Sequence, residues 1–182
     1  MLDYQIKTGR LSLMPLTIPI LESILKGPGS FLHLTSYQLP ETFTEFPESM
    51  EYTINWMLKS TPQLPWTSYA IISDMARTYI GQCGFKSSPD ENGQVELGYE
   101  IAKDFRLKGY ATEVITALID VAFANPQVKM IIAHTLALQN ISNHLLIKHG
   151  FVFDKSLEDE DDGKIWKWTL NRQVYHWRKL MV

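Results

Sequence analysis

Apolar residues in this chain alternate with polar ones in some stretches and recur every three to four residues in others. The first pattern predicts strands and the second predicts helices. The strand-like stretches are residues 10–16, 68–73, 78–86, 94–102, 128–136, from 151 onward, and 164–171. The helix-like stretches are 17–27, 47–59, 111–123 and 141–149. The change of period after residue 110 marks the clearest boundary between the two kinds of element.

The order of these elements defines the expected architecture. The order β-α-α-β-β-β-α-β-α-β-β predicts an α+β domain with a mixed, mostly antiparallel central sheet and helices on both faces. The nearly continuous apolar run at 128–136 is typical of a central strand buried on both faces. Gly27-Pro28-Gly29 is expected to end the first helix, and Gly150 stands where a helix end favours a left-handed residue. Since neither repeats nor linkers are visible, 1–182 is interpreted as a single domain.

Composition excludes several classes of protein. Hydrophobic residues at 45% and charged residues at 20% are ordinary for a globular protein, and the single Cys83 allows no internal disulfide. A net charge of -3 offers no electrostatic reason to expect a nucleic-acid partner. Residues 1–10 lack the apolar region of a signal peptide, and no stretch approaches the about 20 apolar residues of a membrane span. We therefore expect a cytoplasmic protein without membrane partners, and the spacing of its histidines predicts no metal site.

The most informative stretch, VELGYEIAKDFRLKGYAT at 95–112, leads from a predicted strand through a loop into a predicted helix. Its core is Arg106-x-x-Gly109-x-Ala111. A helix start presents unpaired N–H groups and the positive end of the helix dipole, which together bind anions. Gly109 lets the backbone approach a pyrophosphate, while Arg106 and Lys108 add positive charge. The P-loop and dinucleotide fingerprints are both missing, so the anion is expected to belong to neither a nucleoside triphosphate nor NAD.

This stretch and two others resemble the GNAT acetyltransferases, in particular the type that acetylates the N-termini of ribosomal proteins (RimJ/RimL-like). The three are TGRLSLMPLT, ELGYEIAKDFRLKGYATEVITALIDVAF and HTLALQNISNHLLIKHGFVF, and they stand in the family's order. The resemblance implies a GNAT-like fold, acetyl-CoA as donor, and strands that part after Glu100 so that pantetheine pairs with the backbone there. The cofactor-binding residues that it implies are Tyr99, Glu100, Ile101, Arg106, Leu107, Lys108, Gly109, Tyr110, Ala111, Thr112, Gln139 and Asn140.

The chain departs from the family pattern near the predicted helix at 141–149. Many relatives have asparagine where this chain has Gln139, with Asn140 one place later, so either amide can meet the cofactor. Some relatives have a tyrosine acid where this chain has Leu146. Ser142, which matches the serine of the family pattern, then takes the catalytic role by default. Asn140 and Ser142 also suit the N-cap of the helix, and that alternative stays open.

A second catalytic group is expected on the strand at 94–102. Glu96, Gly98 and Glu100 share one face of this strand. A primary amine is protonated at pH 7, so its attack on a thioester needs a base or a water relay. Either carboxylate can supply the base, and Glu96 is the favoured candidate. The alternative is a half-solvated strand with its polar residues outward.

The sequence therefore predicts an N-acetyltransferase that moves an acetyl group from acetyl-CoA to a primary amine by direct attack. The acceptor is a small amine or a protein N-terminus. A non-catalytic acyl-CoA or small-ligand binding module is the alternative. Trp166 and Trp168 are interpreted as core or dimer contacts, which leaves a homodimer open. The acidic run Glu158–Asp162 is either a solvated turn or a surface that attracts cationic acceptors.

Overall fold

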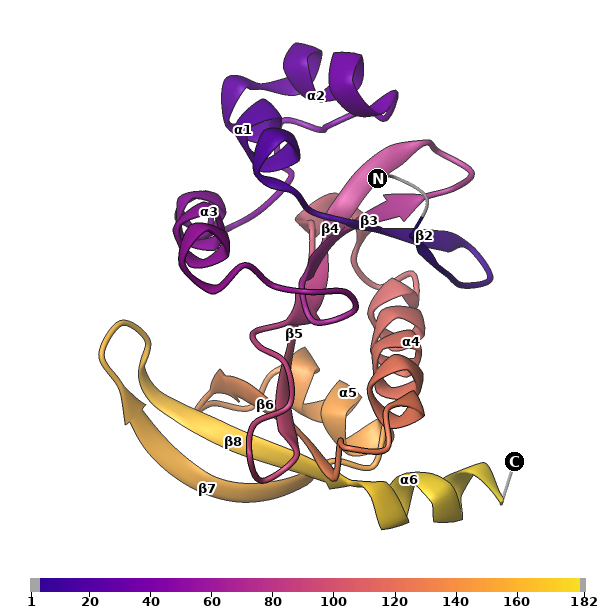
Figure 1. Ribbon diagram of the computed structural model, residues 1–182, viewed down its shortest axis with the longest axis vertical. Helices are drawn as coiled ribbons and strands as arrows, with labels where there is room; N and C mark the ends of the chain where they lie inside the picture. The colour runs from indigo at the N-terminus through magenta and orange to yellow at the C-terminus, as the bar shows by residue number, and fades with distance from the viewer. Residues whose placement is uncertain (1–3, 181–182) are drawn as a thin grey trace.

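The computed structural model describes residues 4–180, and its strands form a single eight-stranded sheet in the order β1-β2-β3-β4-β5-β6-β8-β7 (Figure 1). The strands are β1 (Ile6–Lys7), β2 (Leu11–Pro15), β3 (Ser68–Ser73), β4 (Thr78–Phe85), β5 (Gln94–Ile101), β6 (Met130–Leu136), β7 (Val152–Asp159) and β8 (Gly163–Asn171). The helices are α1 (Ile18–Lys26), α2 (Pro28–Thr35), α3 (Glu48–Ser60), the 3-10 turn η1 (Lys103–Phe105), α4 (Tyr110–Ala124), α5 (Ile141–Lys148) and α6 (Arg172–Lys179). The predicted α+β fold is confirmed.

The junction between β5 and β6 is the parallel pairing of the sheet, while the other neighbouring strands run antiparallel. It consists of the pairs Gln94 with Met130, Val95 with Ile131, and Glu96 with Ile132. Beyond Glu96 the two strands part. The divergence expected after Glu100 therefore begins four residues earlier, because β5 continues along β4 as far as Ile101 while β6 continues along β8.

The sheet separates two hydrophobic cores. On one face α4 packs through Leu118 against residues that include Ile71. On the other face Leu21 of α1 and Met50 of α3 pack against Ile72, the next residue of β3. Successive residues of one strand thus serve opposite cores, as the pleat of a strand requires. In Figure 1, α3 and α4 flank the middle of the sheet from opposite sides.

Two helices lie where none was predicted. The run Gly27-Pro28-Gly29 ends α1 and also begins α2, because Gly27, with φ of 107°, turns the chain and Pro28 occupies the first turn, where its missing N–H costs nothing. Phe31 of α2 is fully buried. At the other end α6 is tied down by Arg172, whose guanidinium donates hydrogen bonds to the carbonyls of Val128, Phe123 and Asn125.

The expectation that β6 is buried on both faces is wrong. Ile131 and Ala133 are buried, whereas Ile132 and His134 on the opposite face are only half-buried. This face is open because the core under α1 and α3, as far as the described residues show, includes no residue of β6.

The two tryptophans of β8, Trp166 and Trp168, both contact Phe153 of the neighbouring strand β7. Trp168 belongs to the core and donates its indole N–H to Thr135 Oγ1 at 2.9 Å. Trp166 is half-buried and packs edge-on against Phe153. The interpretation of both as core contacts accounts for these positions.

Candidate active site

The loop before α4 presents a row of free backbone donors. Gly109, in the left-handed region with φ of 80°, is the N-cap of α4 and offers no side chain to cap it. Within residues 4–180, the N–H groups of 107–112 find no hydrogen-bond acceptor, and the first to do so is Glu113 N, which donates to the Gly109 carbonyl. Unpaired N–H groups at the positive end of a helix dipole are the donors that an anion site requires.

The charged side chains of this loop are arranged differently from the expectation. Arg106 donates through Nε to the Ile101 carbonyl at 2.8 Å and pairs with Glu45 at 2.6 Å. Its hydrogen bond and its charge hold the pKa of the Glu45 carboxyl below its usual range. Lys108 donates to the Asp104 carbonyl at 3.0 Å. Glu45 therefore compensates the charge of Arg106, which the sequence analysis had expected to be available to an anion.

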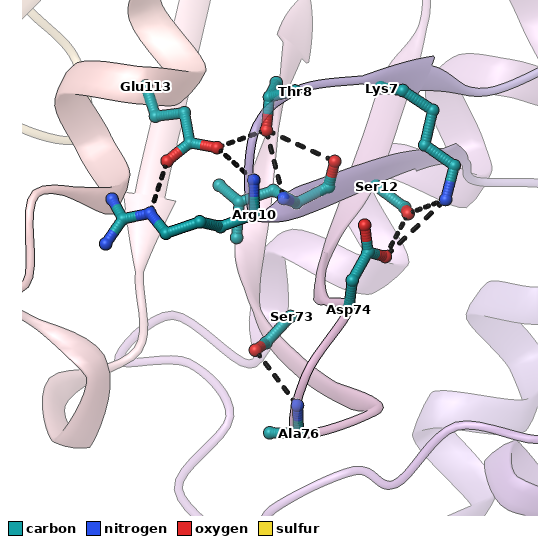
Figure 2. A network of polar contacts seen from close by, with 9 residues as sticks. Lys7, Thr8, Arg10, Ser12, Ser73, Asp74, Ala76 and Glu113 are labelled. Atoms are coloured by element: carbon teal, nitrogen blue, oxygen red, sulfur yellow. Dashed lines mark hydrogen bonds and ion pairs between the residues drawn. The ribbon is translucent and has the colours of Figure 1, made fainter.

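A polar network anchors the start of α4 to the turn before β2, as Figure 2 shows. Glu113 accepts hydrogen bonds from Thr8 Oγ1, from Arg10 N at 2.7 Å and from Arg10 Nε at 2.8 Å. Arg10 also donates to the Lys108 carbonyl at 3.0 Å and lies over the ring of Tyr110. Burial would raise the pKa of Glu113, but the hydrogen bonds from Thr8 and Arg10 outweigh it and lower the pKa.

This network escaped the sequence interpretation because its partners lie far apart in the chain, with Arg10 and Glu113 separated by 103 residues. Periodicity and local motifs carry no signal for such a pair. In Figure 2 a second cluster, in which Lys7 and Ser12 meet Asp74, lies on the other side of the same turn.

Where β5 and β6 part, the structure brings together Tyr99 and Ser142. The Tyr99 hydroxyl is buried. Burial raises the pKa of Tyr99, although an interaction with the Ser142 side chain lowers it. Both residues were named from the sequence, Tyr99 as a cofactor contact and Ser142 as a catalytic residue, but nothing in the sequence placed them side by side.

Asn140 caps the start of α5, which is the alternative to a cofactor contact that the sequence analysis left open. Asn140 Oδ1 accepts a hydrogen bond from Asn143 N at 3.0 Å, whereas Gln139 is exposed. Asn143, which the sequence analysis did not single out, is buried and donates to the Leu138 carbonyl at 2.7 Å. The carbonyl side of Asn140 is thus occupied by the cap, so only its amide N–H₂ group faces outward for a ligand.

Glu96 lies in a cluster of opposite charges on the half-open face of β5. Its carboxylate meets Lys86 Nζ at 2.5 Å and His134 Nδ1 at 2.9 Å. Burial would raise the pKa of Glu96, but the hydrogen bonds from His134 and Lys86 lower it below the usual value. His134, on β6, was considered in the sequence only as a metal ligand and was set aside.

A cavity of about 390 Å³ lies between α3 and the strands β4 and β5. Its lining residues are Phe46, Ser49, Tyr52, Thr53, Trp56, Ser68, Gln82, Cys83, Gly84, Phe85, Lys86, Gly98, Tyr99 and Glu100. Glu100 is held there by Thr44 Oγ1 and by Glu45 N, each at 2.7 Å from its carboxylate. Glu100 therefore ties the segment before α3 to β5. The aromatic residues of α3 that line this cavity, Tyr52 and Trp56, were not singled out from the sequence.

Neither a metal site nor a membrane-spanning helix was expected from the sequence. In the part of the chain that the structure describes, no three His, Cys, Asp or Glu side chains gather as a metal site would require. None of the helices between residues 4 and 180 is long and apolar enough to cross a membrane.

A helix start with unpaired N–H groups lies beside two parting strands, and a cavity borders the same strand β5, so the chain offers places for an anionic ligand and for a second, smaller one. Residues 31–152 match the acetyltransferase (GNAT) domain family. The chain belongs to this family and is an acyltransferase of the N-acetyltransferase type. GNAT acetyltransferases use acetyl-CoA as the acetyl donor.

Similar proteins support the same assignment. The uncharacterized N-acetyltransferase YjdG of Bacillus subtilis (strain 168) is 29% identical over 156 residues, which cover 84% of this chain and 93% of YjdG. The spermidine/spermine N-acetyltransferase SpeG of Vibrio cholerae has a similar structure, with a TM-score of 0.68, 19% identity, and coverage of 94% of this chain and 99% of SpeG. RimL, a ribosomal L7/L12 alpha-N-protein acetyltransferase solved with coenzyme A, has a TM-score of 0.67 at 13% identity, with 92% and 98% covered. At these identities the two solved structures show a shared fold.

Proposed function

We propose that this enzyme transfers the acetyl group of acetyl-CoA directly to a primary amine, without a covalent enzyme intermediate. The pyrophosphate of the donor binds the N–H groups of 107–112, and the thioester lies in the gap where β5 and β6 part. The observation that carries the proposal is the row of unpaired donors at the start of α4. Tyr99, Glu100 and Ile101 border the gap, and Gln139 or Asn140 reaches the cofactor from the start of α5.

Ser142 supplies the proton that the CoA thiolate needs as it leaves. The buried Tyr99 hydroxyl beside it supports this role, because a phenol whose pKa is raised stays protonated at neutral pH and can return the proton to Ser142.

The acceptor binds in the cavity beside α3. Five of its lining residues are aromatic: Phe46, Tyr52, Trp56, Phe85 and Tyr99. The carboxylate of Glu100 already accepts two hydrogen bonds from the segment before α3. Such a cavity favours a primary amine carried by an apolar body over a polyamine, whose several charges need several free carboxylates. A small aromatic amine and a protein N-terminus with an apolar first residue both satisfy this description.

The proposal is tested by release of free CoA thiol from acetyl-CoA, with intact-mass analysis of the acceptor. The panel contains 2-phenylethylamine, spermidine and peptides with free N-termini. We expect one acetyl group on 2-phenylethylamine or on peptides with an apolar first residue. Absence of acetylated product with every amine would overturn the transferase proposal in favour of a binding module.

The acceptor cavity has its own test in Trp56→Ala. Loss of one aromatic wall removes about 1.5 kcal/mol of contact, so KM for 2-phenylethylamine should rise roughly tenfold. Trp177→Ala is the matched control, because Trp177 is exposed on α6. An unchanged KM in Trp56→Ala would show that the acceptor binds elsewhere.

A further inference from the structure

His134 stands at the mouth of the gap between the parting strands. The last residues paired between β5 and β6 are Glu96 and Ile132, and His134 is two residues further along β6 on the same face as Ile132. Its Nδ1 lies 2.9 Å from a carboxylate oxygen of Glu96. The side chains of His134 and Glu96 are 21% and 18% exposed, so the pair is mostly sheltered from water but still reachable.

The partner of Nδ1 determines which ring nitrogen is free. Because its pKa lies below the usual value, the Glu96 carboxyl is ionised at neutral pH and can only accept a hydrogen bond. In neutral His134 the proton must therefore sit on Nδ1, and Nε2 carries the lone pair. Among the described residues, nothing forms a hydrogen bond with Nε2 of His134.

The same cluster reaches the acceptor cavity. Lys86, which binds the other side of the Glu96 carboxylate, lines the cavity together with Gly98, the next residue after Glu96 on this face of β5. The Glu96 carboxylate thus links His134 to Lys86 at the wall of the cavity, and the pairing of β5 and β6 ends at Glu96 itself.

We propose that His134 is the base that takes the proton of the attacking amine, and that Glu96 is its positioning residue. This inference rests on the proposed acetyl transfer. It changes the role of Glu96 from the base expected from the sequence to the group that orients the base. An ionised carboxylate held by two cationic or polar donors is a weak base, whereas imidazole is matched to neutral pH.

The acetyl transfer moves one acetyl group and two protons. The amine lone pair attacks the thioester carbonyl carbon, a C–N bond forms, and one nitrogen proton passes to Nε2 of His134. The C–S bond then breaks and its electron pair leaves on sulfur as the CoA thiolate. The thiolate takes up one proton by way of Ser142, and the imidazolium of His134 returns one proton to water. An acceptor that arrives as an ammonium releases one more proton to solvent.

Charged groups from each neighbouring element bear on this imidazole. Glu96 on β5 and Lys86 after β4 have been described. Asp159 on β7 interacts electrostatically with both His134 and Lys86. Lys167 opposes His134 across β8 and pairs with Asp154 at 3.5 Å. Among the described residues, Glu96 is the charged group that forms a hydrogen bond with the ring.

The test compares the pH dependence of kcat/KM for acetylation of 2-phenylethylamine in the wild type and in His134→Asn. Asparagine keeps a donor for Glu96 near the position of Nδ1 but has no basic nitrogen. We expect the wild type to lose activity in acid, because a protonated imidazole cannot accept the proton of the amine. The variant should be roughly 100-fold slower at neutral pH and should recover as the pH rises, because the amine then loses its proton unaided.

The controls separate this role from a structural one. His176→Asn, on the exposed face of α6, should keep the wild-type profile. His134→Asn should retain its affinity for CoA and its thermal midpoint, and added imidazole should restore part of its rate. Glu96→Gln lets the ring adopt either tautomer, so kcat should fall about tenfold while KM for the amine barely changes.

The outcomes distinguish the two proposals. No thiol release from the wild type with any amine contradicts the acetyl transfer itself. Wild-type turnover in His134→Asn at neutral pH refutes the base assignment and leaves the transferase intact. If His134→Asn fails to fold, an unchanged kcat in Glu96→Gln refutes the assignment, because the ring would then need no positioning residue.

Discussion

Replacement of Gly109 by alanine tests the cofactor loop with a single methyl group. Gly109 adopts φ of 80° and ψ of 2°, in the left-handed region that costs an L-residue about 1 kcal/mol. The nearest atom that a Cβ would meet is Arg10 Nη2 at 3.5 Å, an ordinary contact. The protein itself can therefore accommodate the methyl group. What the methyl group obstructs is the space in front of the N–H groups of 107–112.

The expected loss of affinity follows from those donors. A hydrogen bond to a charged group contributes about 1.5–3 kcal/mol. If the methyl group holds the pyrophosphate away from one or two of them, binding weakens by about 3 kcal/mol, roughly 100-fold in Kd. Isothermal titration with CoA measures this loss, and thermal unfolding without ligand measures the cost to the fold.

The matched control is Gly163→Ala, at the first residue of β8, directly after the turn from β7. Gly163 has φ of 68° and no atom within 4 Å of an added Cβ, so the backbone penalty is comparable while the cofactor loop is untouched. We expect both variants to lose similar stability and only Gly109→Ala to lose affinity for CoA. Equal Kd values for wild type and Gly109→Ala would refute the assignment of this loop.

Two further predictions concern charged groups. Because the folded-state pKa of Glu113 is lowered, its hydrogen bonds stabilise the fold above pH about 4.3 and are lost as the pH falls through the lowered value. Glu113→Gln should therefore lower the free energy of unfolding by about 1–2 kcal/mol at pH 7, and this difference from the wild type should vanish in acid. Chemical unfolding at a series of pH values measures the difference. A difference that does not change with pH would contradict the role of the carboxylate. Amides in place of Glu160, Asp161 and Asp162 should lower kcat/KM for spermidine at low salt without changing kcat, if the acidic run attracts cations. An equal effect on a neutral acceptor would identify a solvated turn.

Local sequence patterns were sufficient to predict most of the helices and strands, and also the loop before α4. The strand at 68–73 matches β3, and the switch of period after residue 110 marks the start of α4. The loop before α4 was predicted because its determinants, a glycine and the helix start, are neighbours in sequence. The same local patterns predicted only a helix end at Gly27-Pro28-Gly29. A second helix begins there as well, because Pro28 fits the first turn of a new helix.

The catalytic face could not be predicted because its residues meet only through the sheet. His134 and Glu96 are 38 residues apart and come together where β5 and β6 pair and then part. The apolar run at 128–136 indicates a buried strand, but it cannot reveal that the neighbouring strand leaves. The openness of one face of β6 follows from the core under α1 and α3, which, as far as the described residues show, includes no residue of β6.

The early divergence of β5 and β6 also gives the sheet two edges in the interior of the molecule, in addition to β1 and β7 at its rims. An uncovered strand edge offers its peptide groups to any extended chain that reaches it. A cofactor that lies along these edges would shield them, much as a neighbouring strand does. Protein freed of its cofactor is then the form most prone to strand addition by other copies, so CoA in storage buffers should slow aggregation as well as raise thermal stability.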